Sequence, residues 1–341
     1  SVQTIQQSIA TAANANTLFG LRNITGADAS PLIGDTSNAI IVQPGQSIQA
    51  VLNAAGNEPR MVLLKAGVHK IKETLKIPSN TILTGEGSKT KLFLDPASGM
   101  RDAMVNADST MHDVTIRNMV IEVSDRLEVP SDPNSHRSRG GGYNRGGILF
   151  HAMREGQMKN IHLVNLTIRN ATFNGVFISG ADNVNVLGCD FDENGGNAIP
   201  GQKLQHNLLL THCKNIVVKD SRLTTSPFGA GLALDQCKNA AIVDNEIARN
   251  GYYGILIAES KQVEVKGNLI EANDRSGIML EYLFNGNAMV NIHDNKIQFN
   301  AGWAIESYAT LAIKTDRNET QLNGSNKEQI RVSAEKKILM Q

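Results

Sequence analysis

The stretch NAAIVDNEIARNGYYGILIA, residues 239–258, decides the fold. It holds three short apolar segments, at residues 240–242, 245–247 and 255–257, which are separated by Asn, Asp and Gly. Within each segment the apolar residues alternate, as they do in a half-buried strand. The pattern therefore predicts three short strands joined by corners.

Rows of the same kind precede and follow this stretch. Their first residues are Asn160, Asn183, Asn215, Asn239, Gln262 and Met289. The clean steps are 23 or 24 residues, and the two longer steps carry insertions. A fixed period of this size is typical of a repeat architecture, in which stacked coils pair in parallel and bury one continuous core. Over residues 39–307 the repeat resembles the pectate-lyase-like proteins. The resemblance implies an all-β fold, a right-handed, single-stranded parallel β-helix with three strands per coil.

One inward-facing column supports the stacking. It consists of Met119, Leu166, Cys189, Ser221, Asn245, Asn268 and Asn295. We expect the three Asn residues to form a ladder, in which each amide bonds to backbone or to the next Asn about 4.8 Å away. The alternative is that they only favour turns. Cys213 and Cys237 lie one coil apart, so we expect either a disulfide or two small buried thiols.

The ends of the chain differ from the repeat. Residues 1–38 predict an extension or cap, with a short amphipathic helix followed by an irregular segment. A strand at Ala39–Val42 and a helix after Ser47 come next, and the helix would cover the open N-terminal end of the core. We therefore divide the chain into this extension, a β-helix domain over residues 39–332, and a tail over residues 333–341.

The composition of the chain disfavours some classes of binding partner. Lys plus Arg and Asp plus Glu both number 33, so a general nucleic-acid or anionic-membrane binder is disfavoured. No apolar run reaches the roughly 18 residues that a membrane helix needs. Because the chain starts at Ser1 without Met, we expect a signal segment to have been removed and the protein to be secreted, periplasmic or on the cell surface. The sequence leaves the oligomeric state open.

Two polar insertions, residues 122–145 and 195–207, interrupt the repeat just before a strand of the Gly-Ile-x-Ile type. They lie two coils apart, about 10 Å, and would wall the coil between them. A third insertion, residues 282–288, follows that strand. An outward-facing column runs along these strands and consists of His151, Ser179, Thr211, Asp235, Ala258 and Glu281. The family resemblance implies that sugar chains bind at this face.

Basic residues gather around the column. They are His136, Arg137, Arg139, Arg145, Arg154, Lys203 and His206. Such a groove on an uncharged chain predicts an acidic, uronate-containing polysaccharide or oligosaccharide as the ligand. β-Elimination would need a cation on the substrate carboxylate and a base for the C5 proton. Arg145 or Arg139 suits the first role, and His151, Lys203 or His206 suits the second. C5 epimerisation begins in the same way, so lyase and epimerase both stay open.

Two other classes of function compete. A glycoside hydrolase would use Asp235 and Glu281, which lie roughly 9–10 Å apart at the backbone, near the separation of an inverting pair; Glu259 is a further candidate. In a lyase these two carboxylates would bind sugar hydroxyls, and Tyr252 and Tyr253 would stack on sugar rings. The third class is a non-catalytic, adhesive β-helix. Motifs of polygalacturonase-type hydrolases, the main pectate lyases and mannuronan epimerases are absent, so no subfamily is assigned.

Cofactor signals are weak. Acidic residues recur along the turns at Asp190, Asp192, Glu193, Asp220 and Asp244. They leave calcium as a candidate cofactor, although their spacing matches no defined calcium loop. No other cofactor is predicted. His162 and His293 fall away from the proposed groove, and we expect both to be structural.

Overall fold

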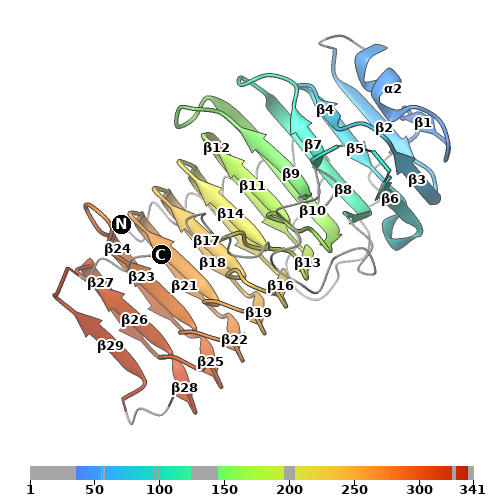
Figure 1. Cartoon of the computed structure of the whole chain (residues 1–341). Helices are drawn as coiled ribbons and strands as arrows, with labels where there is room; N and C mark the ends of the chain where they lie inside the picture. The colour runs from blue at the N-terminus through green and yellow to red at the C-terminus, as the bar shows by residue number, and fades with distance from the viewer. Residues whose placement is uncertain are drawn as a thin grey trace.

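The computed structural model describes residues 36–54, 56, 58–95, 97–98, 100–123, 145–195, 204–324 and 328–336. These residues form coils stacked along one axis, with α2 at one end and β29 at the other (Figure 1). Every strand pairing in the described chain is parallel, and the strands form three walls that follow one another around each full coil. The parallel β-helix with three strands per coil is therefore confirmed.

The first two walls are continuous because two long strands, β8 (His112–Glu122) and β10 (Met158–Arg169), run through both. The rest of the first wall comprises β1 (Ile40–Val42), β2 (Arg60–Leu64), β5 (Thr81–Thr84), β12 (Ala181–Leu187), β15 (Lys214–Lys219), β18 (Lys238–Val243), β21 (Lys261–Lys266), β24 (Ala288–His293) and β27 (Leu311–Asp316).

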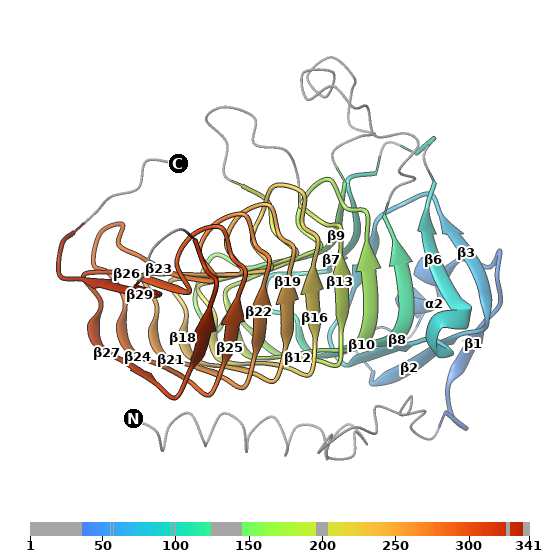
Figure 2. The ribbon, with the colours of Figure 1, turned by 90° about the horizontal axis from the view of Figure 1, so that it is seen from below.

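The rest of the second wall comprises β3 (Gly67–Ile71), β6 (Thr90–Leu94), β13 (Asp190–Asp192), β16 (Arg222–Thr224), β19 (Glu246–Ala248), β22 (Leu269–Glu271), β25 (Lys296–Gln298) and β28 (Glu319–Gln321). A single 3₁₀ turn, η1 (Gly87–Lys89), precedes β6. Strands of this wall lie side by side in Figure 2.

The third wall is a 10-stranded sheet in the described chain. It comprises β4 (Leu75–Ile77), β7 (Asp102–Asn106), β9 (Gly146–His151), β11 (Val176–Ser179), β14 (Leu208–Thr211), β17 (Leu232–Asp235), β20 (Ile255–Ala258), β23 (Ile278–Glu281), β26 (Ile305–Tyr308) and β29 (Ile330–Ser333). Its outer face carries the candidate site.

Single residues in the left-handed region turn the chain at its corners. In the coil that begins at Asn239 they are Asn239, Asp244, Arg249 and Glu259, with φ between 51° and 56°. Asn and Asp tolerate this region better than most residues, which explains the polar separators in the sequence. Met289 adopts the same conformation (φ 54°), so the coil geometry imposes it even where the side chain does not favour it.

The predicted Asn ladder is confirmed and extends one coil further. From Asn245 through Asn268 and Asn295 to Asn318, each Nδ2 donates to the next Oδ1 at 2.9 Å. Each Oδ1 also accepts the backbone N–H of the preceding Asn. Buried amides therefore satisfy backbone groups that the corner leaves without a strand partner.

A second ladder was not predicted. It runs through Asn250, Asn273, Asn300 and Asn323, with steps of 2.9, 2.8 and 2.8 Å. Asn207 continues it by donating to the Oδ1 of Asn250 at 3.1 Å. The corner between the second and third walls is thus held in the same way as the corner between the first and second.

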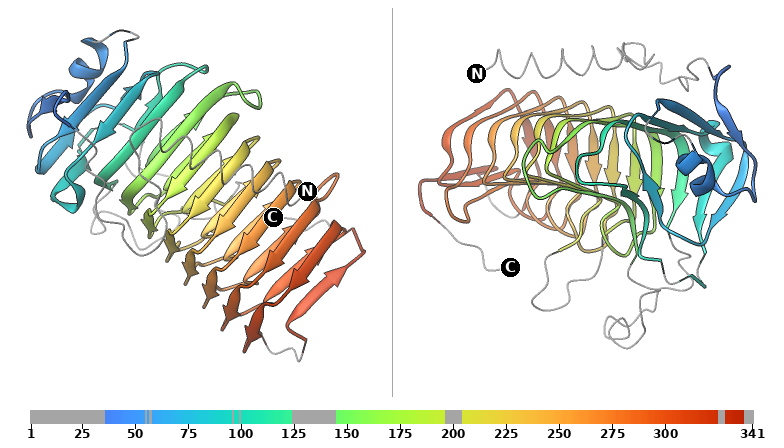
Figure 3. Two further views of the ribbon diagram at one scale, coloured as in Figure 1. Left: turned by 180° about the vertical axis from the view of Figure 1, so that it is seen from behind. Right: turned by 90° about the horizontal axis from the view of Figure 1, so that it is seen from above.

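One apolar core fills the space between the walls. Helix α2 (Ile48–Ala54) buries Ile48 and Leu52 against its N-terminal end, as the sequence predicted. Figure 3 shows this helix from two further sides. Cys213 and Cys237 are free and buried, so they fill the core as thiols and form no bridge.

Two histidines of the first wall lie away from the third-wall face. His162 is buried in β10, which lowers its pKa to about 4. His293 contacts Glu264 and Asp294 at 3.0 and 2.6 Å. The domain limits at residues 38 and 332 remain predictions; β1 begins at Ile40 and β29 ends at Ser333.

Candidate active site

The predicted outward-facing column exists. Strand register pairs His151 with Ser179, Ser179 with Thr211 and Thr211 with Asp235. Further along, Ala258 pairs with Asp235 on one side and with Glu281 on the other. Alternation along each strand places all six side chains on the outer face, because the intervening Ile, Leu or Phe residues point into the core.

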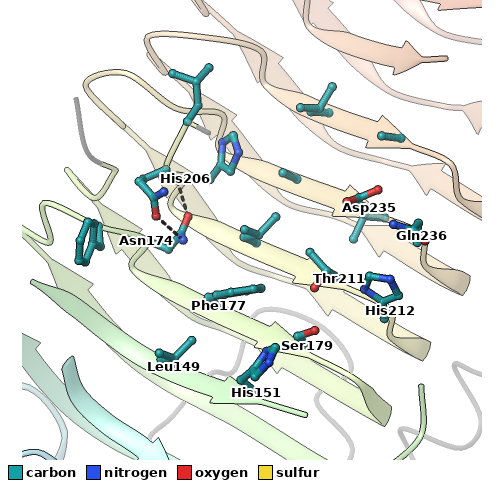
Figure 4. A pocket seen from close by; sticks show the side chains of 18 of the residues that line it. Leu149, His151, Asn174, Phe177, Ser179, His206, Thr211, His212, Asp235 and Gln236 are labelled. Atoms are coloured by element: carbon teal, nitrogen blue, oxygen red, sulfur yellow. Dashed lines mark hydrogen bonds between the residues drawn. The ribbon is translucent and has the colours of Figure 1, made fainter. Parts of the chain in front are cut away.

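A groove of about 890 Å³ lies over this column. All six column residues line it, from His151 at one end to Glu281 at the other. Figure 4 shows part of this lining, with His151, Ser179, Thr211 and Asp235 along neighbouring strands. The remaining lining residues are Arg101, Asp102, Ile148, Leu149, Phe173, Asn174, Phe177, Leu204, Gln205, His206, Leu209, His212, Ala233, Leu234, Gln236, Leu256, Leu283 and Phe284.

Glu281 is a buried acid of the groove. Its side chain is 1% exposed, and its Oε1 has no hydrogen-bond partner within the described residues. Burial, helped by the negative charges of Asp235 and Glu259, raises the pKa of Glu281 to about 7. A carboxyl group of this kind holds a proton near neutral pH and can donate it.

Asp235 faces Glu281 along the column. The two residues lie two strands apart, roughly 9–10 Å at the backbone, with Ala258 between them. The methyl side chain of Ala258 leaves room in the groove between the two carboxyl groups. Asp235 is only half-buried, so one acid of the pair is more solvated than the other.

His206 does not suit the predicted role of base. Its Nδ1 accepts the backbone N–H of Ala230 at 2.9 Å, which leaves the proton on Nε2. Burial lowers its pKa to about 4. The backbone N–H of His206 also donates to Oδ1 of Asn174 at 2.6 Å, as Figure 4 shows. The residue lines the groove as a neutral hydrogen-bond donor and corrects the sequence expectation.

Arg145 does not reach the groove. Its side chain is 1% exposed and does not line the cavity. The guanidinium donates to the carbonyl oxygens of Asp95, at 2.8 Å, and Ser98. These bonds hold the preceding coil, so the expected contact with a substrate carboxylate is replaced by a structural one.

His151 keeps its predicted position. It is exposed, lines the groove, and lies 6.3 Å from the ring of Phe177, centroid to centroid. Its backbone N–H donates to Oδ1 of Asn106 at 2.8 Å, which fixes the end of β9. Arg154 is exposed but lies outside the lining.

Tyr252 and Tyr253 form no stacking surface in the groove. Their rings pack on each other, with centroids 4.3 Å apart, and neither lines the cavity. Tyr253 is buried in an apolar cluster on the outer face with Leu256 and Met279. This packing corrects the expectation that the pair stacks on sugar rings.

Glu259 is also unsuited to catalysis. Its carboxylate accepts the backbone N–H groups of residues 283–286 at 2.7–3.0 Å. Burial raises its pKa, but these four bonds outweigh burial and leave the pKa below its ordinary value. The residue therefore stays ionised and holds a loop.

Within the described residues, the lining of the groove carries fewer basic side chains than the predicted surface. His136, Arg137, Arg139 and Lys203 lie outside the described residues. In the described lining Arg101 is the only Arg or Lys, and it sits 4.9 Å from the ring centroid of Phe173. Three carboxyl groups, those of Asp102, Asp235 and Glu281, share the same lining.

The acidic turns carry ion pairs and hydrogen bonds. Asp190 contacts Arg222 at 3.2 Å, and Asp192 accepts from Thr224 at 2.9 Å. Among the described residues no group of three or more His, Cys, Asp or Glu side chains is arranged to hold a metal ion.

Comparisons with known proteins agree with the fold. A family described as "Right handed beta helix region" matches residues 202–334. The surface adhesin PfbA of Streptococcus pneumoniae is similar at 16% identity, with a TM-score of 0.63 over 84% of this chain and 78% of PfbA. DFA-IIIase from Arthrobacter chlorophenolicus A6, without its lid and in complex with GF2, has 11% identity and a TM-score of 0.60 over 86% and 93% of the two chains.

ORF18 of Geobacillus virus E2 has 13% identity and a TM-score of 0.50, over 81% of this chain and 56% of its own. The sequence matches none of the curated proteins it was compared with. In the described part of the chain, no helix is long and apolar enough to cross a membrane. At these identities the structural likeness concerns the fold alone. The chain thus has the fold of a right-handed parallel β-helix, and no narrower family is assigned to it.

Proposed function

We propose that the groove hydrolyses a glycosidic bond of an oligosaccharide or polysaccharide. The observation that carries the proposal is Glu281, a buried carboxyl group with a pKa near 7 at one end of the groove. In this role Glu281 is the general acid, and it donates its proton to the glycosidic oxygen as the bond breaks.

Asp235 is the second carboxylate. In the proposed reaction it acts as the general base and removes a proton from the water that attacks the anomeric carbon. The backbone separation of the two acids is near the upper end of the range for inverting enzymes, about 6.5–9.5 Å between carboxyl groups. The proposal therefore expects inversion at the anomeric carbon.

Lyase or epimerase chemistry is the second candidate. His151 favours it, because this exposed residue lines the groove. Here His151 would remove the C5 proton of a uronate. Arg101 lies at the opposite edge of the sheet, because the register pairs Asp102 with Gly146, five residues before His151, so Arg101 would bind the carboxylate of another sugar unit. Burial of Arg145 and the low pKa of His206 remove two of the groups that the sequence offered for this reaction.

One set of assays separates the candidates. Wild-type protein is incubated with xylan, inulin, alginate, pectate and hyaluronan, and reducing ends and absorbance near 235 nm are followed together. Hydrolysis gives reducing ends without absorbance, and both Glu281→Gln and Asp235→Asn abolish it. NMR of the first product reports the anomeric configuration.

Other outcomes reject the proposal. A rise in absorbance that is lost in His151→Ala would establish a lyase, and exchange of the C5 proton without cleavage would establish an epimerase. Binding to a polysaccharide without turnover would favour an adhesive protein. Action on a polysaccharide also implies a secreted, periplasmic or surface location, which cell fractionation would check.

A further inference from the structure

The loop after β23 forms one edge of the groove. It runs from Tyr282 to Asn287 and begins directly after Glu281, and both Leu283 and Phe284 line the cavity. The ring of Phe284 is 81% exposed. Because it lines the groove next to a buried acid, this exposed ring presents apolar surface to any ligand bound there.

The backbone of this loop is held at several points. Glu259 accepts four consecutive N–H groups, at 2.8 Å from Leu283, 2.9 Å from Phe284, 2.7 Å from Asn285 and 3.0 Å from Gly286. The four N–H groups of the loop thus all donate to one carboxylate, and this arrangement stabilises the ionised form of Glu259.

Two further bonds close the loop on itself and on its strand. The hydroxyl of Tyr282 donates to the carbonyl of Phe284 at 2.7 Å. The side chain of Asn287 donates to the carbonyl of Glu281 at 2.9 Å. The carbonyl of Phe284 and the end of β23 are therefore both held by hydrogen bonds, and the exposed ring projects from backbone that is already fixed.

We propose that Phe284 is a stacking surface for a sugar ring bound next to Glu281, and that Glu259 is the residue that positions it. The ligand class, a glycan, rests on the proposed function. The C–H face of a sugar ring is apolar, and a flat aromatic ring buries it without demanding hydrogen bonds. Because the loop is fixed before the ligand arrives, little additional order is required on binding.

Other exposed phenylalanines provide a comparison. Phe228 and Phe299 are 41% and 52% exposed, and neither lines the groove. Phe284 alone among these three combines high exposure, a fixed loop and a place beside the candidate acid. Phe228 therefore serves as the matched control.

The test measures binding in a protein that cannot turn over. Every variant carries Glu281→Gln, which also removes the charge coupling between Glu281 and Glu259. Dissociation constants are measured by affinity electrophoresis in native gels that contain xylan, inulin, alginate, pectate or hyaluronan. We expect Phe284→Ala to weaken binding of the retained polysaccharide by about tenfold, and Phe284→Trp to keep it within about threefold of the parent. Phe228→Ala should bind like the parent.

Glu259→Gln tests the positioning role. It replaces a carboxylate oxygen with an amide NH₂ that faces backbone N–H groups, so the loop loses its fixed shape while the ring remains. We expect binding to weaken about fivefold, and to weaken no further when Glu259→Gln is added to Phe284→Ala. If the losses of affinity caused by Glu259→Gln and Phe284→Ala multiply in the double variant, the positioning role is overturned. Circular dichroism with thermal melting shows that each variant is folded.

The two proposals fail separately. If wild type cleaves a polysaccharide and Phe284→Ala, made for this assay with Glu281 intact, has an unchanged KM, the stacking surface is rejected and hydrolysis stands. If the protein binds without cleaving and Phe284→Ala loses affinity, hydrolysis is rejected and the stacking surface stands. Absence of retardation in every gel would reject the stacking surface.

Discussion

Replacing Glu281 by Gln should raise the stability of the protein in alkaline solution while abolishing activity. The amide has nearly the shape of the protonated acid but never ionises. In the wild type the carboxyl group lies buried at the base of the groove, near Asp235 and Glu259, and its pKa is about 7 in place of 4.5.

The size and sign of the effect follow from this pKa. The folded protein binds the proton more tightly than the unfolded chain does, so wild-type stability falls as pH rises from about 4.5 to about 7. At about 1.4 kcal/mol per pKa unit, the loss amounts to roughly 3 kcal/mol. Glu281→Gln does not lose this contribution. We expect its free energy of unfolding to match the wild type near pH 4.5 and to exceed it by up to roughly 3 kcal/mol above pH 8.

Urea unfolding of both proteins over this pH range gives the comparison. The difference between the two curves reports the titration of Glu281 together with its coupling to Asp235 and Glu259, because every other titrating group is shared. Glu259→Gln is the opposite control: the folded protein lowers the pKa of Glu259, so this variant should be less stable than wild type at neutral pH and approach it as acid protonates Glu259. A difference between wild type and Glu281→Gln that stays constant from pH 4.5 to pH 9 would refute the assignment of a raised pKa to Glu281.

Three further predictions concern neighbouring features. Asp235→Asn should lower the pKa of Glu281, since it removes one of the negative charges that add to the effect of burial; carboxyl ¹³C NMR titration would detect the shift, and an unchanged pKa would contradict it. Asn273→Ala should destabilise the protein by about 3 kcal/mol in urea, because it leaves buried ladder partners unbonded, and a loss well under 1 kcal/mol would argue against the ladder. Gly254→Ala should lower the melting temperature markedly, because a Cβ there would lie 2.6 Å from the carbonyl oxygen of Gly277; an unchanged melting temperature would show that the coils can separate to admit it.

The fold was predictable because its information is local and repeated. Alternating apolar residues define each strand, and the period defines the stack, so the outward-facing column from His151 to Glu281 could be placed without coordinates. The first Asn ladder was found because its members recur at one position of the row. The second was missed because Asn250 and its equivalents read as turn residues, and because Asn207 joins it from inside an insertion.

The candidate site was less predictable, because side chains beside long insertions have no repeat to fix their direction. Arg145 directly precedes β9, a strand of the groove, but its guanidinium points inward because it donates to carbonyl oxygens of the preceding coil. The Nδ1 atom of His206 accepts the backbone N–H of Ala230 from the following coil, and this bond sets the tautomer of the ring. The position of Phe284 could not be predicted from the sequence around it, because it depends on the carboxylate of Glu259, which belongs to another coil.

The parallel register has a consequence for how the chemistry of such a groove can change. Positions on the outer face recur only at whole multiples of the strand spacing, about 4.8 Å, so two acids in one column can never be moved apart or together by a small amount. A carboxylate at Ala258 would stand one strand from Asp235 and one from Glu281, near the separation of about 5–5.5 Å that retaining enzymes use. A single substitution at Ala258 could thus change the stereochemical outcome from inversion to retention. In this architecture the separation of two catalytic acids changes only in steps of one strand spacing.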